Sequence, residues 1–92
     1  MQLYTYYNGR VGQVEGTFAA GTDVINIIGQ KEKIRDFKGL FKIGIQTAPY
    51  TIIEINGATI KIGASGIYEL DTVNVYSLKF ITEATALVDY VY

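Results

Sequence analysis

The stretch Ile52-Ile53-Glu54-Ile55-Asn56-Gly57-Ala58-Thr59-Ile60-Lys61 is the part of the sequence that best defines the fold. Asn-Gly is the dipeptide most typical of a two-residue β-hairpin turn, and here it lies between two runs of β-favouring residues. A turn at Asn56-Gly57 leaves Glu54, Thr59 and Lys61 pointing to water, and the inward face then carries Ile53, Ile55, Ile60 and Ile62. A slip of one residue would expose all of these isoleucines, so the pattern predicts this hairpin in this register.

A second Asn-Gly pair, Asn8-Gly9, predicts another hairpin near the start of the sequence. In its register Tyr7 lies opposite Arg10, and Leu3 lies opposite Val14. Both faces of this hairpin carry apolar or aromatic side chains, which is typical of strands that are covered on both sides. We expect one of the two covers to come from another subunit.

Residues 23–28, Asp-Val-Ile-Asn-Ile-Ile, lie between glycines and are predicted to form a strand. The competing interpretation is a helix from about residue 22 to residue 37. Its apolar stripe would consist of Val24, Ile27, Ile28 and Ile34. That helix would contain Gly29, at a cost of about 1 kcal/mol, and Lys31 would interrupt the stripe. The strand, followed by a short turn or helix near residues 30–37, is the favoured prediction.

Alternating apolar and polar side chains indicate further strands, in residues 41–46, 67–71, 76–80 and 86–92. Tyr68, Tyr76 and Tyr90 follow this alternation and are expected in or beside the core. The chain is therefore predicted to be all-β: a small antiparallel β-sandwich or jelly-roll-like domain of about seven to eight short strands. We expect one domain over residues 1–92, in which residues 1–39 supply the N-terminal hairpin and strand.

Composition excludes several classes of function. The 92 residues contain no cysteine and no histidine, so disulfides, thiolate or imidazole metal sites and Ser-His or Cys-His catalytic pairs are impossible. The net charge is −1 and no dense run of one sign occurs, so we expect no nucleic-acid partner. No apolar run approaches the ~20 residues that cross a bilayer, and the N-terminus resembles no signal peptide. Neither membrane insertion nor ordinary export is expected.

The carboxylates offer the remaining possibility of chemistry. Glu69 and Asp71 share a face of a predicted strand, and Glu54 could join them to bind calcium or to act as a glycosidase pair. An ordinary solvent face is favoured, because no Asp- or Asn-rich loop of ligand spacing accompanies them. Gly63-Ala64-Ser65-Gly66 is likewise expected to be a tight turn rather than a phosphate-binding loop. We therefore predict no catalytic residue, no metal site and no cofactor.

Eight tyrosines and no tryptophan suggest where partners bind. Tyrosine is enriched at protein interfaces, and exposed rings can also stack on sugars. The predicted interface residues lie in the two terminal strands and are Tyr4, Tyr6, Tyr7, Val88, Tyr90 and Tyr92. Tyr50, in the turn after Pro49, is the candidate ligand-contact residue.

Ordered segments within residues 40–92 carry a resemblance to a known family. These segments are Ile43-Gly44-Ile45-Gln46, Ala48-Pro49-Tyr50-Thr51, Ile55-Asn56-Gly57, residues 62–70, residues 77–80 and residues 88–92. Together they resemble a domain that recurs in minor structural, tail or head-fibre proteins of phages and prophages of Gram-positive bacteria. Members of that family often have Pro-Gly-Thr where this chain has Pro49-Tyr50-Thr51, so Tyr50 departs from the family pattern.

The resemblance implies a non-enzymatic virion structural protein, made in the bacterial host cytoplasm. Such a protein would be a tail or baseplate subunit, or a capsid-associated fibre or decoration subunit. Its partners would be further copies of itself, a trimer being one such assembly, and other virion proteins. The alternative is a receptor- or carbohydrate-binding module of a phage particle, which would bind a host surface glycan through exposed tyrosines.

Overall fold

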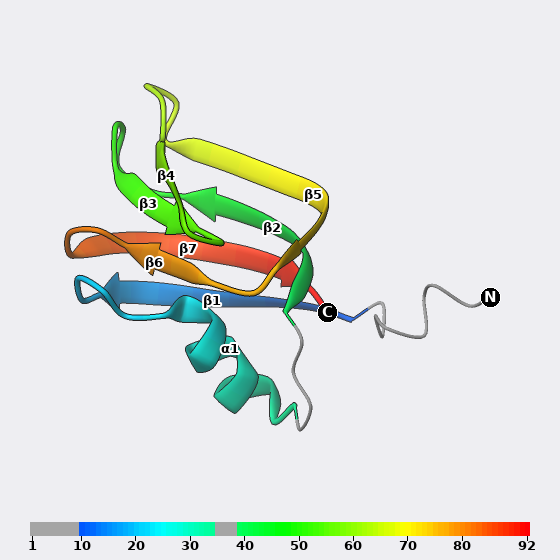
Figure 1. Cartoon of the computed structure of the whole chain (residues 1–92). Coiled ribbons are helices and arrows are strands. Elements are labelled where there is room, and N and C mark those ends of the chain that lie inside the picture. The colour runs from blue at the N-terminus through cyan, green and yellow to red at the C-terminus, as the bar shows by residue number, and fades with distance from the viewer. Residues whose placement is uncertain (1–9, 35–38) are drawn as a thin grey trace.

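The computed structural model describes residues 10–34 and 39–92, which form seven strands and one helix (Figure 1). In chain order the elements are β1 (Val11–Phe18), α1 (Val24–Glu32), β2 (Leu40–Gln46), β3 (Ile52–Ile55), β4 (Ala58–Lys61), β5 (Ile67–Val75), β6 (Leu78–Phe80) and β7 (Ala84–Val91). The predominance of short antiparallel strands confirms the predicted all-β class.

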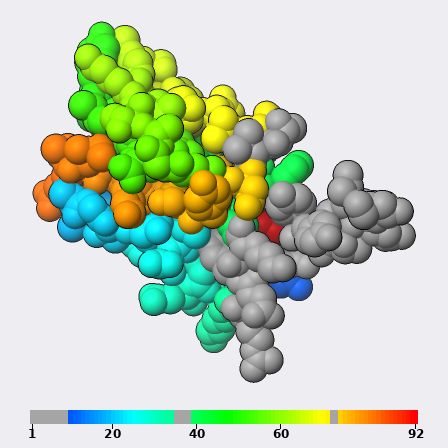
Figure 2. Space-filling model, in the orientation of Figure 1, coloured from blue at the N-terminus to red at the C-terminus, as the bar shows by residue number. Residues whose placement is uncertain are grey.

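The strands form two antiparallel sheets arranged as a small β-sandwich (Figure 1). The larger sheet has the order β1-β7-β2-β5, and the smaller has the order β4-β3-β6. Helix α1 extends the smaller layer, because Asp23 at its start forms a β-bridge with Lys79 of β6. The smaller sheet and the helix cover one face of the larger sheet, and Figure 2 shows the molecule from the side of this covering layer.

The core between the two layers is apolar, and none of the described polar or charged side chains is buried. Its fully buried large side chains are Tyr90, Phe80, Ile28, Leu40, Ile43, Ile45, Ile53, Ile62, Leu78, Val24, Val75 and Val88. Tyr68 packs against this core, as predicted. The same prediction is wrong for Tyr76, which is 60% exposed because it lies in the turn between β5 and β6.

The β3–β4 hairpin has the predicted register, with Ile53 opposite Ile60. Asn56 and Gly57 have φ angles of 50° and 85°. Positive φ at both central residues is what a type I′ turn requires, and this turn matches the right-handed twist of the paired strands. Turn chemistry and side-chain alternation therefore specify the same structure here.

Asn56 also joins the hairpin to the chain between β5 and β6. Its side-chain Oδ1 accepts hydrogen bonds from the backbone N–H groups of Tyr76, at 2.9 Å, and Ser77, at 3.2 Å. Its Nδ2 donates to the carbonyl of Asn74 at 2.9 Å. One turn residue thus stabilises both its own hairpin and the crossing from the larger sheet to the smaller one.

The predicted strand at residues 23–28 is wrong, because this segment begins helix α1. Asp23 is the N-cap: its backbone is extended, and its Oδ1 accepts from the N–H of Ile25 at 3.0 Å. The same oxygen accepts from the N–H of Leu78 at 3.3 Å, which ties the helix start to β6. Lys33 ends the helix in a left-handed conformation with φ 56°.

Packing explains why the helix forms despite a glycine within it. Val24, Ile25 and Ile28 lie on one face and are all buried in the core. Their burial outweighs the cost of about 1 kcal/mol that Gly29 imposes on a helix. The short turn or helix expected near residues 30–37 is therefore the end of an element that starts earlier, and part of that range lies outside the described residues.

Most of the hairpin predicted at Asn8-Gly9 lies outside the described residues, but Arg10 and the strand after it are described. Arg10 pairs with Tyr92: its N–H donates to the Tyr92 carbonyl at 3.0 Å, and its carbonyl accepts from the Tyr92 N–H at 2.8 Å. Val14 lies opposite Val88 in the same ladder. The partner of β1 in the described structure is thus β7, the last strand in chain order.

Candidate functional site: an open sheet face with a free edge

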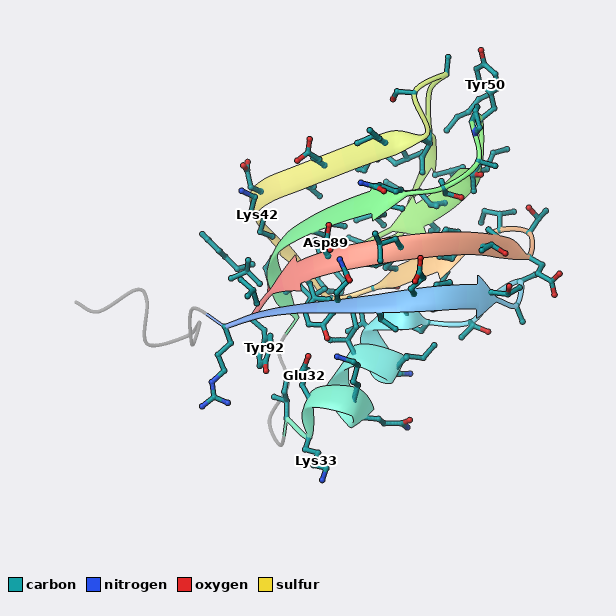
Figure 3. The ribbon with its side chains drawn as sticks, turned by 180° about the vertical axis from the view of Figure 1, so that it is seen from behind. Glu32, Lys33, Lys42, Tyr50, Asp89 and Tyr92 are labelled. Atoms are coloured by element: carbon teal, nitrogen blue, oxygen red, sulfur yellow. The ribbon has the colours of Figure 1, made fainter. Side chains whose placement is uncertain are left out.

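The outer face of the larger sheet is open to solvent, and Figure 3 shows the molecule from that side. Inward-facing residues such as Ile43, Ile45 and Val88 are buried, so their neighbours along each strand point outward. The outward set comprises Val11, Gln13, Glu15 and Thr17 of β1, Thr85, Leu87, Asp89 and Val91 of β7, Lys42, Gly44 and Gln46 of β2, and Ile67, Glu69 and Asp71 of β5. This face combines carboxylates, amides, one lysine and scattered aliphatic side chains.

A shallow hollow of about 580 Å³ lies on this face, above Gly44. Gly44 has Asp89 of β7 on one side and Glu69 of β5 on the other. A Cβ built on Gly44 would lie 3.9 Å from both the Asp89 Oδ2 and the Glu69 Cγ. The glycine therefore forms a floor between two carboxylate side chains.

A hydrogen bond and an ion pair position the side chains around the hollow. The Gln13 Nε2 donates to the Asp89 Oδ1 at 2.6 Å, which fixes that carboxylate against β1. The Lys42 Nζ lies 3.9 Å from the Asp71 Oδ2, and both of these side chains are at least half exposed. An exposed pair of this kind contributes little to stability. The groups could donate to and accept from a polar ligand or a partner side chain.

The carboxylates singled out from the sequence are brought together only in part. Glu69 and Asp71 share the outer face, as predicted, but Glu54 lies in the smaller sheet, opposite Thr59. Within residues 10–34 and 39–92, no group of three or more acidic side chains is placed to hold a metal ion. Sequence reasoning missed Asp89 as the carboxylate facing Glu69, because only the strand order brings β7 and β5 to either side of β2.

Strand β1 is one edge of the larger sheet. In an antiparallel ladder, alternate residues direct both backbone groups toward the neighbouring strand. Arg10 forms a hydrogen-bonded pair with Tyr92, so the even-numbered residues of β1 face β7. The N–H and C=O groups of the odd-numbered residues, Val11, Gln13, Glu15 and Thr17, point away from the sheet. In the described part of the chain no strand lies beside them.

Tyr50 lies at the end of the sandwich far from α1 and is 58% exposed (Figure 3). It lies in the turn between β2 and β3, and its backbone φ is 65°, in the left-handed region. The Lys61 Nζ lies 5.5 Å from the centre of its ring, within the range of a cation–π contact. The ring is therefore displayed at the surface and positioned by a neighbouring strand.

The predicted interface at the C-terminal strand is wrong as an exposed surface. Val88 has no solvent exposure, Tyr90 is 2% exposed and Tyr92 is 9% exposed. Their side chains complete the core of their own chain, because the smaller layer covers that face of β7. The tyrosines predicted at the other end, Tyr4, Tyr6 and Tyr7, lie outside the described residues.

Glu32 explains how the two C-terminal tyrosines are buried. The hydroxyls of Tyr90 and Tyr92 both donate to its carboxylate, from Tyr92 to Oε1 at 2.9 Å (Figure 3). These hydrogen bonds, with that of Tyr90 the larger influence, lower the pKa of Glu32 below its ordinary value. Burial, and then the hydrogen bond to Glu32, raises the pKa of Tyr90. These hydrogen bonds hold the end of α1 against the C-terminal strand of the same chain.

Gly12 leaves the space that the Glu32 and Tyr90 side chains occupy. A Cβ on Gly12 would lie 2.6 Å from the Tyr90 ring and 2.5 Å from the Glu32 Oε2, closer than nonbonded atoms approach.

Gly63-Ala64-Ser65-Gly66 forms the predicted tight turn between strands, with the Ser65 Oγ accepting from the N–H of Ile67 at 3.2 Å. The Gly66 N–H donates to the Gly63 carbonyl at 3.1 Å, which closes this turn.

Comparison with known proteins identifies no family for the chain: no protein-family model matches it, and a search of curated proteins finds no significant match. Among the described residues, no helix combines the length and apolar character that crossing a bilayer requires. The resemblance in the second half of the sequence and the geometry of the outer face are thus the basis for inferring a function.

Proposed function

We propose that this chain is a non-enzymatic structural subunit of a phage particle that acts by assembling with copies of itself and with other virion proteins. The observation that carries the proposal is the free edge of β1, a regular strand whose outward backbone groups are unpaired in the described residues. Free strand edges bind other strands, and proteins that do not use them this way usually block them.

The sequence resemblance supports the same proposal. Its segments in residues 40–92 include most of β2, the turn of the β3–β4 hairpin, the β4–β5 turn with the start of β5, and the end of β7. These elements build most of the sandwich. In the proposed role the protein is a virion component, made in the host cytoplasm and placed in the tail, the baseplate or a capsid-associated fibre or decoration.

Mass spectrometry of purified particles, with heads separated from tails, tests the virion assignment. The phage or prophage that encodes the chain should yield its peptides in one of the two fractions at stoichiometric abundance. Absence from both fractions would overturn the proposal. Light scattering on the purified chain at micromolar concentration tests self-assembly separately, and the expected result is a mass well above the 10.2 kDa of one chain.

A receptor- or glycan-binding role is the second candidate, favoured by the exposed ring of Tyr50. Rings displayed at a loop tip can stack on a sugar face. A glycan array should then show binding that is lost in Tyr50→Ala. Tyr76→Ala is the matched control, because Tyr76 is similarly exposed, 60% against 58%, but lies in a different turn. Equal binding by both variants, or no binding by the wild type, would exclude this role for Tyr50.

A further inference from the structure

The four sheet edges of the sandwich differ in how well they could accept another strand. The smaller sheet ends in β4, of four residues, and β6, of three, and edges this short are poor templates for pairing. β5 is longer, but its ladder with β2 is interrupted between Leu40 and Lys42. β1 pairs without interruption over eight residues, from Val11 to Phe18. It is the most regular edge in the described structure.

The sequence of β1 carries few of the features that protect an edge. Lysine, proline and bulges are the usual means of keeping other strands away. β1 has neither a lysine nor a proline, and Glu15 is its one charged residue. Val11 is 78% exposed at its start. A Cβ built on Gly16 would have no other heavy atom within 4 Å, so a second backbone can approach this part of the edge closely.

We propose that β1 pairs with β1 of a second copy, antiparallel and about a two-fold axis at Val14. This inference deepens the proposed assembly function and rests on it. In this register Val11 lies opposite Thr17 of the second copy, and Gln13 lies opposite Glu15. All four outward-pointing residues of each strand then form hydrogen-bonded pairs. The two larger sheets join into one continuous sheet across the dimer.

Side-chain chemistry favours this register over one shifted toward Glu15. The amide nitrogen of Gln13 already donates one hydrogen to Asp89, at 2.6 Å, and has a second hydrogen to donate. Across the axis that hydrogen faces the carboxylate of Glu15 in the second copy. A shift that centres the axis on Glu15 would place two carboxylates directly opposite each other, which is destabilising. It would also place Val11 opposite a residue beyond the end of β1 in the second copy.

A proline substitution tests the pairing in the full-length chain. Glu15→Pro removes an N–H that points away from β7, so the β1–β7 ladder stays intact while the edge is blocked. Glu15→Thr is the control, because it loses the same charge and keeps the N–H. We expect sedimentation velocity to show dimers for wild type and Glu15→Thr, and at least a roughly tenfold higher dissociation constant for Glu15→Pro.

A cysteine placed on the axis tests the register without depending on proline. The chain has no cysteine of its own, so a single introduced thiol can only crosslink to another copy. In the proposed register the two Val14 Cα atoms lie about 4.5 Å apart, which a disulfide can span, whereas the two Val11 residues are about 20 Å apart. Val14→Cys should therefore form covalent dimers in a mild redox buffer, and the more exposed Val11→Cys should not.

The outcomes separate this inference from the proposed function. If the wild type associates but Glu15→Pro associates equally well, or Val14→Cys crosslinks no better than Val11→Cys, pairing through β1 is overturned while assembly stands. A wild type that stays monomeric overturns both pairing and self-assembly, and the particle mass spectrometry still decides the virion assignment. Concentration-independent protection of the Val11, Gln13 and Glu15 amides from hydrogen exchange would show an edge filled within one chain, which also overturns the inference.

Discussion

The β3–β4 hairpin and helix α1 both contain several isoleucines, yet one segment forms two strands and the other forms a helix. Both are rich in isoleucine, but the buried isoleucines of β3 are two apart, Ile53 and Ile55, whereas those of α1 are three apart, Ile25 and Ile28. The clearer difference lies in the polar residues at their ends. Asn56 adopts the positive φ of a hairpin turn, and Asp23 caps a helix. Short polar side chains thus select between two structures that isoleucine alone permits.

Replacing the turn residue should have the largest effect. Asn56→Ala removes the side-chain hydrogen bonds to Asn74, Tyr76 and Ser77 and places an alanine at φ 50°. We expect the free energy of unfolding, measured by urea titration, to fall by about 2–3 kcal/mol. Asn56→Gly loses the same hydrogen bonds without the backbone strain and should regain about 1 kcal/mol. Equal losses in the two variants would show that the strain contributes nothing.

The helix cap should be worth less. Asp23→Ala deprives the N–H groups of Ile25 and Leu78 of their acceptor, and the expected loss is about 1–2 kcal/mol. Asp23→Asn keeps an oxygen in the same place and should lose clearly less. If the asparagine variant were as unstable as the alanine variant, the carboxylate charge rather than the cap oxygen would be the stabilising feature.

The smallest effect should come from removing the hydrogen bonds that Glu32 accepts from Tyr90 and Tyr92, and this effect should depend on pH. Tyr90 and Tyr92 lower the pKa of Glu32 in the folded state below its ordinary 4.5. The resulting stabilisation is fully present above pH 4.5 and is lost as the pH falls through the lowered folded-state pKa. Glu32→Gln should therefore be less stable than wild type at pH 7, with the difference shrinking below pH 4.5.

Urea unfolding at a series of pH values measures this difference. Glu83→Gln is the control, since it changes an exposed glutamate in the turn before β7. Its difference from wild type should be small. A Glu32→Gln variant with an unchanged stability difference from pH 7 to pH 3 would contradict the proposed role of the tyrosine hydroxyls.

Much of the fold follows from local sequence signals. The Asn56-Gly57 turn and the alternating isoleucines predicted the hairpin and its register correctly, and the β2 strand was equally clear. Residues 23–28 were misassigned because their apolar run is short enough to suit either a strand or a buried helix. The N-cap oxygen of Asp23, and a covering position beside β6, decide in favour of the helix.

The candidate site was less predictable because it depends on strand order. The shared face of Glu69 and Asp71 follows from a spacing of two, and the exposure of Tyr50 follows from its turn. The hydrogen bond from Gln13 to Asp89 joins residues 76 positions apart, which no local pattern can indicate. The alternation in the last strand did predict that Tyr90 lies in or beside the core. The hydrogen bond from its hydroxyl to Glu32 joins residues 58 positions apart and could not be predicted from local sequence.

The pairing of β1 with β7 has a consequence for how the chain folds. Val11 lies opposite Val91, so one of the first strands to be synthesised lacks its sheet neighbour until almost all of the described chain exists. Contacts this distant in sequence slow folding, because a long loop must close before they form. Meanwhile β3 and β4 can fold from adjacent residues. We infer a hairpin that forms early and a larger sheet that closes last, with the β7 side of β1 unpaired until then.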